Sequence, residues 1–335
     1  MKPEYPVRPD TIERLATAVY PSFAMLAGMQ LDVFTPLKEG PLRAEHLANA
    51  LGIDPTRTAR LLYALTAIGL LTVDGDRFAN TPEADHFLVR GRPTYIGMRH
   101  HAYRRRWQSM LQAAESIQTG TPQGRRDYAG MASDERQSFY RGTYTEAVAA
   151  GRDLAARQDF SRHRRLVDVG GGSGGLAIAM AEAWPHLSVT IADLPATIPV
   201  AQRYVDEAGV GDRVRVLAAD VLSDPLSGCY DVAILRGVLI VLAPDQVRHA
   251  LANVSRAIEP GGAIYVVGWT LDDSRISPVE VAAYDLLFLN EYDHAQLWSE
   301  GEIRAWLAEA GFRDITRSPG AFGADFIMAR KATSS

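Results

Sequence analysis

The 335-residue chain has a single cysteine and no long run of apolar residues. One cysteine, Cys229, cannot form a disulfide within the chain, which fits a reducing compartment. We expect it to be a small buried or half-buried filler rather than a nucleophile. The best apolar stretch is interrupted by Arg236 and falls short of the roughly 18 to 20 residues that a membrane span needs. The first ten residues lack the apolar core of a secretion signal, so we expect a cytoplasmic protein with no membrane partner.

An excess of positive charge is also missing. Lysine and arginine number 35 against 40 acidic residues, a formal net charge of −5, so nothing global indicates nucleic acid or an anionic membrane as a partner. Hydrophobic residues make up 47% and charged residues 22%, the balance of a globular protein with a sizeable core. The length allows two domains of ordinary size.

The first part of the chain carries helical patterns and then a wing. Apolar residues at helical spacing in residues 10–35, with a proline interruption, indicate two helices. Helices over residues 43–51 and 55–69 are followed by LLTVDGDRFANT, which predicts two short strands joined by Asp74-Gly75. This order is typical of a winged helix, and more helix is expected up to residue 158.

A winged helix can serve DNA binding or dimerisation. Arg57 and Arg60 on its second helix are an isolated basic pair in a net acidic chain. We therefore expect this domain to dimerise and not to bind nucleic acid.

The second part of the chain alternates strands with helices. LVDV, SVTIAD, VRVLAAD, DVAILR and AIYVVG are short β-rich runs, each separated by a helix-length segment. Such alternation specifies an α/β fold with a parallel, doubly wound sheet. The tail, ITRSPGAFGADFIMARK, predicts a final strand pair at the edge. We place the domain boundary near Phe160, giving domains of residues 1–159 and 160–335.

LVDVGGGSGG is a strand that runs into a glycine-rich turn and then a helix. Glycines let the backbone turn tightly and approach a ligand in front of the helix N-terminus. Gly170, Gly172 and Gly175 satisfy the dinucleotide pattern G-x-G-x-x-G. Gly170, Gly172 and Gly174, preceded by Asp168, satisfy the D-x-G-x-G-x-G of methyltransferases that use S-adenosylmethionine.

Two further acids favour S-adenosylmethionine over a nicotinamide cofactor. Asp193 ends the second predicted strand, where a carboxylate can accept both ribose hydroxyls. Asp220 ends the third, within reach of an adenine amino group. Each aspartate alone is more often a helix cap, but the set lies at the carboxyl edge of the sheet, where ligands of such folds bind.

At this point the chain resembles the two-domain small-molecule methyltransferases of the plant caffeate and bacterial polyketide O-methyltransferase type. The matching features are DVGGGSG, ADLP, Asp220, LRGVL, EPGGAIYV, WSEGEIRAWLAEAGF and the winged helix, so the resemblance covers nearly the whole chain. It implies a Rossmann-like class I methyltransferase domain and an obligate homodimer whose N-terminal domains interlock, the partner completing part of each pocket. It also implies an S-adenosylmethionine site made by Gly170, Gly172, Asp193, Leu194, Asp220, Val221 and Arg236.

The family's catalytic histidine is absent. Members that methylate oxygen carry a pattern like L-x-x-V-L-H-D-W after the fourth strand, and its histidine takes the proton of a phenol. Aligning LRGVL places Ile240 at that position, and the acid that orients the histidine corresponds to a position near Leu297. Three acceptors need no base before attack: a thioether sulfur, an activated carbon and an ionised acid. A base supplied by another residue remains an alternative.

Candidate substrate-binding residues come from three segments rich in histidine, tyrosine and polar groups: His100, His101, Tyr103, Tyr140, Tyr144, Asn290, Tyr292 and His294. Among them, His101, His294 and Tyr144 are the candidates for a catalytic group. A metal site that includes Asp293 is not expected, because the adjacent histidines at 100 and 101 should point in opposite directions on a helix.

The sequence therefore predicts a homodimeric, S-adenosylmethionine-dependent methyltransferase that acts on a small molecule. The preferred acceptor is the thioether sulfur of a small carboxylate, which gives a sulfonium. This is similar to the methylthiohydroxybutyrate S-methyltransferases of dimethylsulfoniopropionate synthesis. One alternative is O- or C-methylation of an aromatic or polyketide metabolite, with His101 or His294 as base. The other is a family member that binds the cofactor without transferring methyl.

Overall fold

The computed structural model describes residues 7–125, 130–223 and 225–333. The chain forms two compact units, residues 1–104 and 105–335. The functional boundary near residue 160 remains a prediction. Within the described ranges, no helix has both the length and the apolar character needed to cross a bilayer.

The first unit opens with α1 (Asp10–Thr17) and α2 (Val19–Leu31), which confirms the two predicted helices. The break falls at Ala18 rather than at the proline. Pro21 lies in the first turn of α2, where a backbone N–H has no helical partner and its loss carries little penalty.

A winged helix follows, as predicted. Asp54 caps its second helix, because the Asp54 side chain accepts a hydrogen bond from the Arg57 N–H at 2.7 Å. The three short strands form one antiparallel sheet in the order β1-β3-β2. The elements of this part are η1 (Pro36–Glu39), β1 (Leu42–Arg43), α3 (Ala44–Leu51), α4 (Pro55–Ala67), β2 (Leu71–Asp74), β3 (Arg77–Asn80), α5 (Pro82–Leu88) and η2 (Gly97–Arg99).

The second unit is built on a seven-stranded sheet in the order β6-β5-β4-β7-β8-β10-β9. Neighbours from β6 to β8 pair in parallel, and β10 pairs antiparallel with both β8 and β9, so the predicted sheet and its final strand pair are confirmed. The strands are β4 (Arg165–Val169), β5 (Ser188–Asp193), β6 (Val214–Ala218), β7 (Tyr230–Arg236), β8 (Ile258–Gly268), β9 (Phe312–Pro319) and β10 (Asp325–Lys331).

Strand order reverses between β4 and β7, because β5 and β6 extend the sheet one way from β4 and β7 and β8 extend it the other way. In such sheets ligands bind beyond the carboxyl ends of the strands at this reversal. The connecting helices are α6 (His100–Met110), α7 (Ala113–Thr119), α8 (Ser133–Arg157), α9 (Gly175–Ala183), α10 (Ile198–Ala208), η3 (Leu239–Val241), α11 (Pro244–Ala257), α12 (Val279–Tyr284), α13 (Leu286–Glu291), α14 (Glu300–Glu309) and η4 (Ala321–Gly323).

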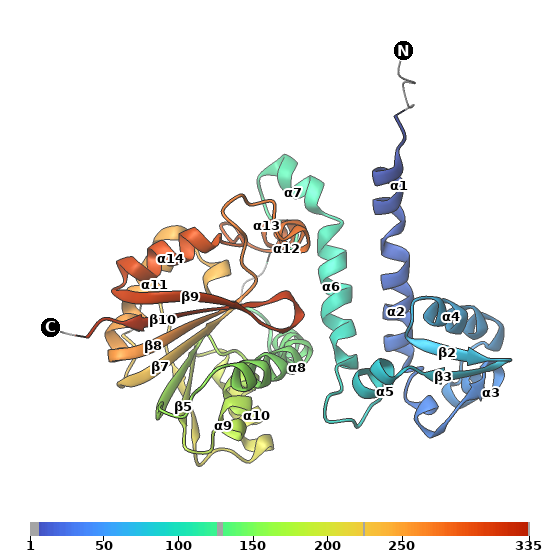
Figure 1. Ribbon diagram of the computed structural model, residues 1–335, viewed down its shortest axis with the longest axis horizontal. Helices are drawn as coiled ribbons and strands as arrows, with labels where there is room; N and C mark the ends of the chain where they lie inside the picture. Colours follow the sequence, from blue (N-terminus) through green and yellow to red (C-terminus); the bar gives the residue numbers. More distant parts are fainter. Residues whose placement is uncertain (1–6, 126–129, 224, 334–335) are drawn as a thin grey trace. The chain divides into compact units, whose positions relative to one another are not determined.

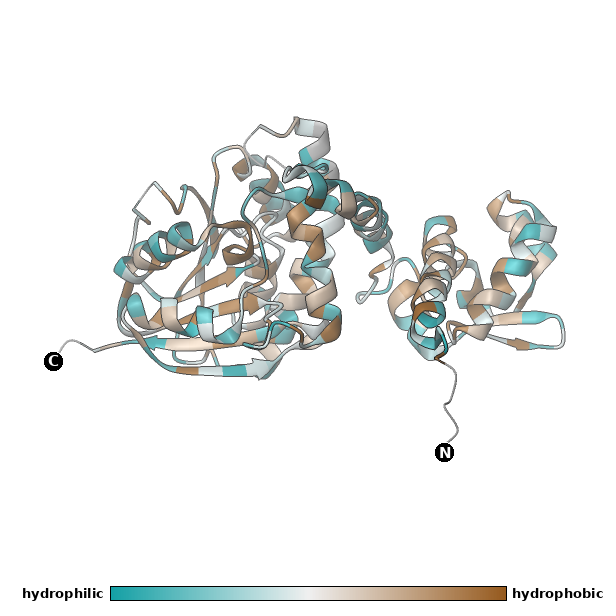
Figure 2. Ribbon diagram, turned by 90° about the horizontal axis from the view of Figure 1, so that it is seen from above, coloured by the Kyte–Doolittle hydropathy of each residue, from teal (hydrophilic) through white to brown (hydrophobic). Residues whose placement is uncertain are grey.

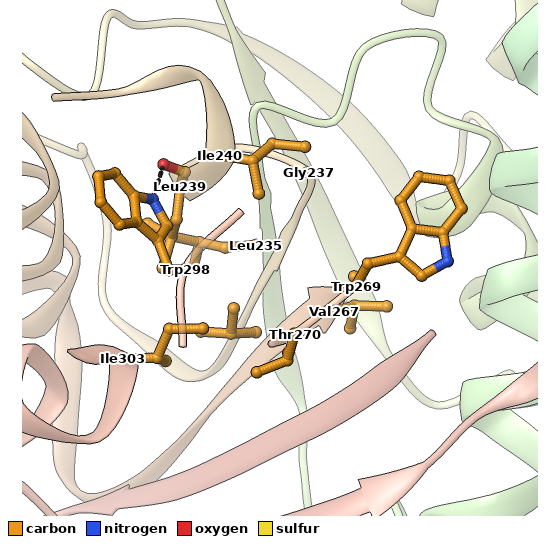
Figure 3. Close-up of a pocket in the computed structure, with 11 residues that line it drawn as sticks. Leu235, Gly237, Leu239, Ile240, Val267, Trp269, Thr270, Trp298 and Ile303 are labelled. Carbon is orange, nitrogen blue, oxygen red and sulfur yellow. Dashed lines mark hydrogen bonds between the residues drawn. The ribbon is translucent and has the colours of Figure 1, made fainter. Parts of the chain in front are cut away.

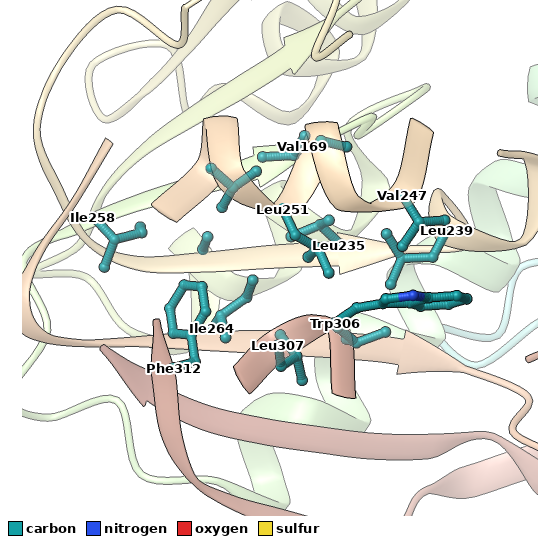
Figure 4. Packing of buried hydrophobic residues seen from close by; sticks show 14 of the residues in the cluster. Val169, Leu235, Leu239, Val247, Leu251, Ile258, Ile264, Trp306, Leu307 and Phe312 are labelled. Atoms are coloured by element: carbon teal, nitrogen blue, oxygen red, sulfur yellow. The ribbon is translucent and has the colours of Figure 1, made fainter. Parts of the chain in front are cut away.

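Helices cover both faces of the sheet (Figure 1). On one face α8, α9 and α10 bury residues such as Leu154, Ile178 and Val205. On the other, α11 and α14 pack residues such as Leu251 and Trp306 against the strands (Figure 4). Hydrophobic residues concentrate in the interior of this unit (Figure 2). Each buried large side chain contributes about 2 kcal/mol of hydrophobic stabilisation, so these layers hold the carboxyl edge rigid.

Cys229 does not lie in this core. It is exposed, and its thiol donates to Glu259 Oε1 at 3.3 Å. The prediction of a buried or half-buried filler is wrong, because Cys229 lies in the turn just before β7 and the first buried side chain of that segment is Tyr230.

Candidate active site at the carboxyl edge of the sheet

The turn after β4 depends on glycine for its shape and for its close contacts. Gly170, Gly172 and Gly174 have φ values of +66°, +60° and +77°, a region that costs other residues about 1 kcal/mol or more. A Cβ at Gly170 would lie 2.5 Å from Val238 Cγ2, and one at Gly172 would lie 2.9 Å from Tyr140 Cε1. Glycine at these positions therefore lets Val238 and Tyr140 pack directly against the turn, with the N-terminus of α9 behind it.

Asp193, the last residue of β5, is hydrogen-bonded to this turn. Its Oδ2 accepts the Gly172 N–H and its Oδ1 accepts the Leu194 N–H, each at 2.7 Å. Burial raises the pKa of the Asp193 carboxyl, and these hydrogen bonds oppose the rise. Each oxygen keeps a second lone pair, so the carboxylate can also accept ligand hydroxyls.

Asp168 lies beneath the same turn and is 1% exposed. Burial raises its pKa to about 7, the charge of Asp193 adds to the rise and Arg236 opposes it. Its Oδ2 has no hydrogen-bond partner within the part of the chain that the structure describes. A Cβ at Gly171 would lie 2.8 Å from that oxygen. Such an unsatisfied buried acceptor is rare in folded proteins and suits a ligand that brings a donor or a positive charge.

Helix α8 closes over the segment that follows β5. The Arg136 side chain donates to the Ala196 carbonyl, and the Tyr140 hydroxyl lies 3.3 Å from Thr197 Oγ1. Arg136 and Tyr140 are four residues apart and so share one face of the helix. We call residues 168–175 and 193–197 the glycine edge.

The remaining residues that the resemblance implied occupy neighbouring strand ends. Asp220 lies two residues beyond β6, and its Oδ1 accepts the Leu222 N–H at 2.9 Å. The carbonyl of Val221 accepts from Asn253 Nδ2 at 2.9 Å. Arg236 is the last residue of β7. Their contacts with a cofactor remain predictions.

A different surface follows β7 and β8. Ile240 lies in η3 and packs in a hydrophobic cluster with residues from the segment after β8, from α12 and α13, and from the segment before α14. The rings of this cluster touch one another, with centroid separations of 4.3 Å for Trp269–Tyr284 and 5.6 Å for Tyr284–Phe288. We call the following six residues of the cluster the aromatic edge: Ile240, Trp269, Tyr284, Phe288, Tyr292 and Leu297.

Ile240 and Leu297 belong to the same cluster although 57 positions separate them. Leu297 is fully buried, and its N–H donates to Asp285 Oδ1 at 2.5 Å. The next residue, Trp298, donates through Nε1 to the Leu239 carbonyl at 2.7 Å (Figure 3). The position that lacks the base and the region that lacks its orienting acid thus both belong to one apolar cluster.

A small cavity of about 20 Å³ lies beside Ile240 (Figure 3). Trp298 and Trp269 stand on opposite sides of it. Most of its lining residues are apolar: Leu235, Gly237, Leu239, Ile240, Val266, Val267, Gly268, Trp269, Thr270, Trp298 and Ile303.

A half-buried ion pair lies near the ring of Tyr284. Arg106 binds Glu146 through two parallel hydrogen bonds of 3.1 and 3.0 Å. The Arg106 guanidinium is 5.9 Å from the centroid of Tyr284. Burial raises the pKa of Tyr284 to about 12, so its hydroxyl remains protonated and can donate a hydrogen bond at neutral pH.

The structure separates the predicted substrate residues of the second unit. Tyr292 is in the aromatic edge, and Tyr140 contacts the glycine edge. Tyr144 instead stacks on Tyr204 of α10, with centroids 4.1 Å apart, and packs in the core beneath α8. His294 is exposed.

Asn290 is fully buried in α13. Its Nδ2 donates to the Leu286 carbonyl at 3.1 Å, and its Oδ1 has no partner among the described residues. Its role in binding a substrate stays a prediction.

His100, His101 and Tyr103 belong to the first unit. The two histidine rings lie 3.9 Å apart, so the expectation that they diverge is wrong. His100 lies at the junction where the 3-10 helix η2 (Gly97–Arg99) runs into α6, so the two residues are not in the interior of a regular α-helix. Burial lowers the pKa of His100. Among the described residues, no three histidine, cysteine or acidic side chains are grouped as metal ligands.

Sequence reasoning missed Trp269, Tyr284 and Phe288. A signal for the last two was present, because aromatic residues recur at 284, 288 and 292, four apart on successive helical turns. Trp269 had no such signal, since it directly follows β8 and does not lie in a helix with recurring aromatic residues.

Two family models match the chain. Residues 117–313 match the O-methyltransferase domain, and residues 13–90 match the O-methyltransferase dimerisation domain. The chain is 32% identical over 324 residues to 3-hydroxy-5-methyl-1-naphthoate 3-O-methyltransferase from Streptomyces sahachiroi, covering 94% of each chain. It is 31% identical over 315 residues to the N,N-dimethyltransferase OxyT from Streptomyces rimosus, covering 90% of this chain and 89% of that one.

The fold is that of a solved relative. Human N-acetylserotonin methyltransferase, in a crystal structure with SAM, superposes with a TM-score of 0.83 at 24% identity, over 99% of this chain and 100% of that one. With the family models, this likeness agrees with the sheet and the glycine edge described above. The chain belongs to the O-methyltransferase family, and it is a methyltransferase that uses S-adenosylmethionine.

Proposed function

We propose that this protein methylates an aromatic, polyketide-type small molecule at an atom that attacks the methyl group without help from a histidine base. The observation that carries the proposal is that Ile240 and Leu297 both belong to one hydrophobic cluster with aromatic rings. This packing lies directly beside the glycine edge, because Val238 of the same loop contacts Gly170.

The glycine edge would hold the cofactor. The glycine turn leads into the N-terminus of α9, Asp193 offers carboxylate oxygens to the ribose hydroxyls, and the unsatisfied Oδ2 of Asp168 suits a positively charged group. S-adenosylmethionine supplies a methyl group on a positively charged sulfur that leaves as a neutral thioether. This chemistry asks mainly for alignment and exclusion of water, both of which a packed edge provides.

The aromatic edge would hold the acceptor. Flat apolar walls such as Trp269 and Phe288 suit a planar ring system through stacking and edge contacts. The acceptor atom uses its own electron pair to form the new bond to the methyl carbon as the carbon–sulfur bond breaks. A proton carried by that atom leaves for water after the bond has formed. No side chain at position 240 can take it, since isoleucine has no basic group.

The relatives favour an aromatic acceptor without fixing the atom. One acts on a hydroxylated naphthoate oxygen by its name, and another is an N,N-dimethyltransferase. An amine nitrogen or an electron-rich ring carbon attacks before it loses a proton. Neither acceptor therefore needs a base at position 240, where Ile240 cannot accept a proton. A phenol could react without a base at this position only if it were already ionised.

A thioether sulfur, the acceptor preferred from the sequence alone, is the second candidate here. It has no proton to lose, and rings such as Trp269 and Tyr284 can stabilise a sulfonium product. A carboxylate on such a substrate would need a cation, however, and Arg106 is already committed to Glu146. We therefore rank the thioether below the aromatic acceptor.

We also propose a homodimer formed through the first unit. That unit contains the dimerisation domain, and α1 has no buried residue. Ile12, Leu15 and Tyr20 are 69%, 58% and 64% exposed, and an exposed apolar set of this kind marks an interaction surface. Sedimentation of the purified chain tests this: a dimer is expected, and a monomer that turns over at full rate would contradict it.

A labelling experiment tests the catalytic proposal. The protein is incubated with methyl-labelled S-adenosylmethionine and a panel of hydroxynaphthoates, aminonaphthoates and small thioether acids. We expect label in the aromatic compounds. Transfer to the thioether acids alone would establish the second candidate. Tight cofactor binding without transfer to any class would indicate a family member that does not methylate.

A further inference from the structure

We propose that Arg317 of β9 is a positioning residue for the acceptor, because it holds two segments of the acceptor surface in place relative to each other. The segments are residues 269–272, which follow β8, and residues 297–300, which lead into α14. The inference rests on the proposed function, which assigns the aromatic edge to the acceptor. Arg317 acts through these segments and not by touching the acceptor, so it is not a catalytic residue.

The Arg317 guanidinium is shared among three carboxylates and one carbonyl. Its Nη1 donates to Asp272 Oδ1 at 3.1 Å and to Glu300 Oε2 at 3.0 Å. Its Nη2 donates to the Thr270 carbonyl at 3.2 Å and to Asp325 Oδ2 at 2.9 Å. The Arg317 side chain is only 18% exposed, and bonds between charged groups are stronger than neutral ones. One side chain of β9 thus joins β10, the first residue of α14 and the segment after β8.

The two segments are also joined through their backbones. The Leu271 N–H donates to the Trp298 carbonyl at 3.0 Å, and the Glu300 N–H donates to the Leu271 carbonyl at 2.8 Å. These bonds form an isolated parallel bridge that belongs to neither sheet. Two such bonds contribute little on their own. Arg317 binds the residues on either side of Leu271 and therefore supports the bridge.

Both segments supply walls of the acceptor surface. Trp269 and Leu297 belong to the aromatic edge, and Leu271 belongs to the same hydrophobic cluster. Trp269 and Trp298 lie on opposite sides of the cavity beside Ile240 (Figure 3). A change in the spacing of the two segments would therefore move the walls against which the acceptor lies.

Arg304 of α14 offers a matched control. Its Nε donates to Glu300 Oε1 and its Nη1 donates to the Ile315 carbonyl, each at 2.6 Å. It therefore shares Glu300 with Arg317 and also joins α14 to β9, but neither of these bonds goes to residues 269–272. Loss of either arginine removes a cation from the same carboxylate, whereas only loss of Arg317 releases the segment after β8.

The test compares Arg317→Met with Arg304→Met, because methionine keeps an apolar stem and donates no hydrogen bond. Arg317→Lys serves as the conservative variant. Asp272→Asn is a milder change at a side chain that is 49% exposed. Calorimetry measures the dissociation constant of the best aromatic acceptor with S-adenosylhomocysteine bound, and that of S-adenosylhomocysteine by itself. Amide hydrogen exchange is followed in peptides that cover residues 269–273 and 298–301 of the free protein.

We expect Arg317→Met to weaken acceptor binding about 10-fold, with S-adenosylhomocysteine within about 2-fold, as for a residue that acts through its neighbours. Exchange should become faster in both segments. Arg317→Lys should restore part of the acceptor affinity, because an ammonium keeps the charge among the carboxylates but not the planar fork. Asp272→Asn should weaken the acceptor by roughly 3-fold, and Arg304→Met should leave it within about 2-fold.

Three results would overturn the inference: an unchanged acceptor affinity in Arg317→Met, equal losses in the two methionine variants, or equal weakening of acceptor and S-adenosylhomocysteine. Each would make Arg317 a residue of the fold alone. If Arg317→Met does not fold, Asp272→Asn decides, and unchanged exchange and acceptor affinity in that variant would contradict the inference. Failure of every aromatic acceptor to bind the original protein would instead overturn the proposed function, and the inference with it.

Discussion

The glycine edge and the aromatic edge lie at adjacent strand ends of one sheet, but the first is formed by polar contacts and the second by apolar ones. At the glycine edge the hydrogen bonds join backbone groups to polar side chains, those of Asp193 and of Arg136 from α8, and Asp168 keeps an unsatisfied carboxyl oxygen. At the aromatic edge, Ile240 and Leu297 replace the polar pair that the family resemblance would place there. We infer that the protein has the residues that bind the methyl donor and that its acceptor surface positions the substrate by shape, without a basic side chain.

The largest expected effect concerns the buried charge of the glycine edge. Burial raises the pKa of Asp168 from 3.8 to about 7, so the folded protein holds a proton that the unfolded chain releases above pH 4. The stability of the fold should therefore fall as pH rises from about 4 to about 7, by about 4 kcal/mol for this group. Urea unfolding of Asp168→Asn should lack this part of the pH dependence.

The control for that measurement is Asp212→Asn, whose side chain is 72% exposed and which should follow the original pH profile. If Asp168→Asn and the original protein show parallel profiles from pH 4 to pH 8, then Asp168 is ionised throughout, and our description of the glycine edge is wrong.

Gly170→Ala should come next and should affect the cofactor. Gly170 and Gly209 both have a φ of +66°. A Cβ on Gly170 would clash with Val238, whereas a Cβ on Gly209 would have no neighbouring atom within 4 Å. Both alanines bear the same backbone strain. Overpacking at Gly170 costs about 3 kcal/mol, which corresponds to roughly 100-fold weaker binding of S-adenosylhomocysteine. Equal affinities for the two variants by calorimetry would show that the contact has no role.

Asp193→Asn should weaken the cofactor by a smaller amount. The amide has one accepting oxygen for the N–H groups of Gly172 and Leu194, and its own NH₂ faces the other. Loss of a charge-assisted bond is worth about 2 kcal/mol, so calorimetry should report a dissociation constant roughly 30-fold higher. A change of less than 3-fold would mean that this carboxylate is not a cofactor ligand.

Ile240→Ala should have the smallest effect on chemistry. Removal of a general base usually lowers the rate by a factor of about 100 or more, whereas truncation of a wall residue should change single-turnover methyl transfer by less than about 10-fold. Its pH profile should match that of the original protein. A loss of 100-fold with unchanged acceptor affinity would mean that position 240 contributes to the chemical step.

The two edges also differ in how far the sequence predicts them. The glycine edge follows from a contiguous pattern, because strand, glycine turn and helix are neighbours in the chain and the positive φ angles demand glycine. The sheet order and the winged helix follow from the same kind of local pattern. Arg136 and Thr197 were missed, since their contacts join α8 to a segment about 60 residues away.

The aromatic edge draws on η3, the end of β8, α12 and α13, and the segment before α14. No local pattern links these elements, and only the resemblance indicated that positions 240 and 297 belong together. Histidines were chosen from the sequence for their chemistry, but burial is a tertiary property. His294 proves to be exposed, and the buried ring of Phe288 and the half-buried ring of Trp269 escaped notice.

The central claim is that methyl transfer proceeds without a histidine base. Single-turnover transfer from labelled S-adenosylmethionine to the best aromatic acceptor, followed from pH 6 to pH 9, tests it most directly. We predict a rate that varies by less than about 2-fold for an acceptor that does not itself titrate in this range, and the same rate in His101→Ala and His294→Ala. A rate that rises with an apparent pKa near 6.5, the ordinary value for histidine, and that is lost in either variant, would contradict the claim.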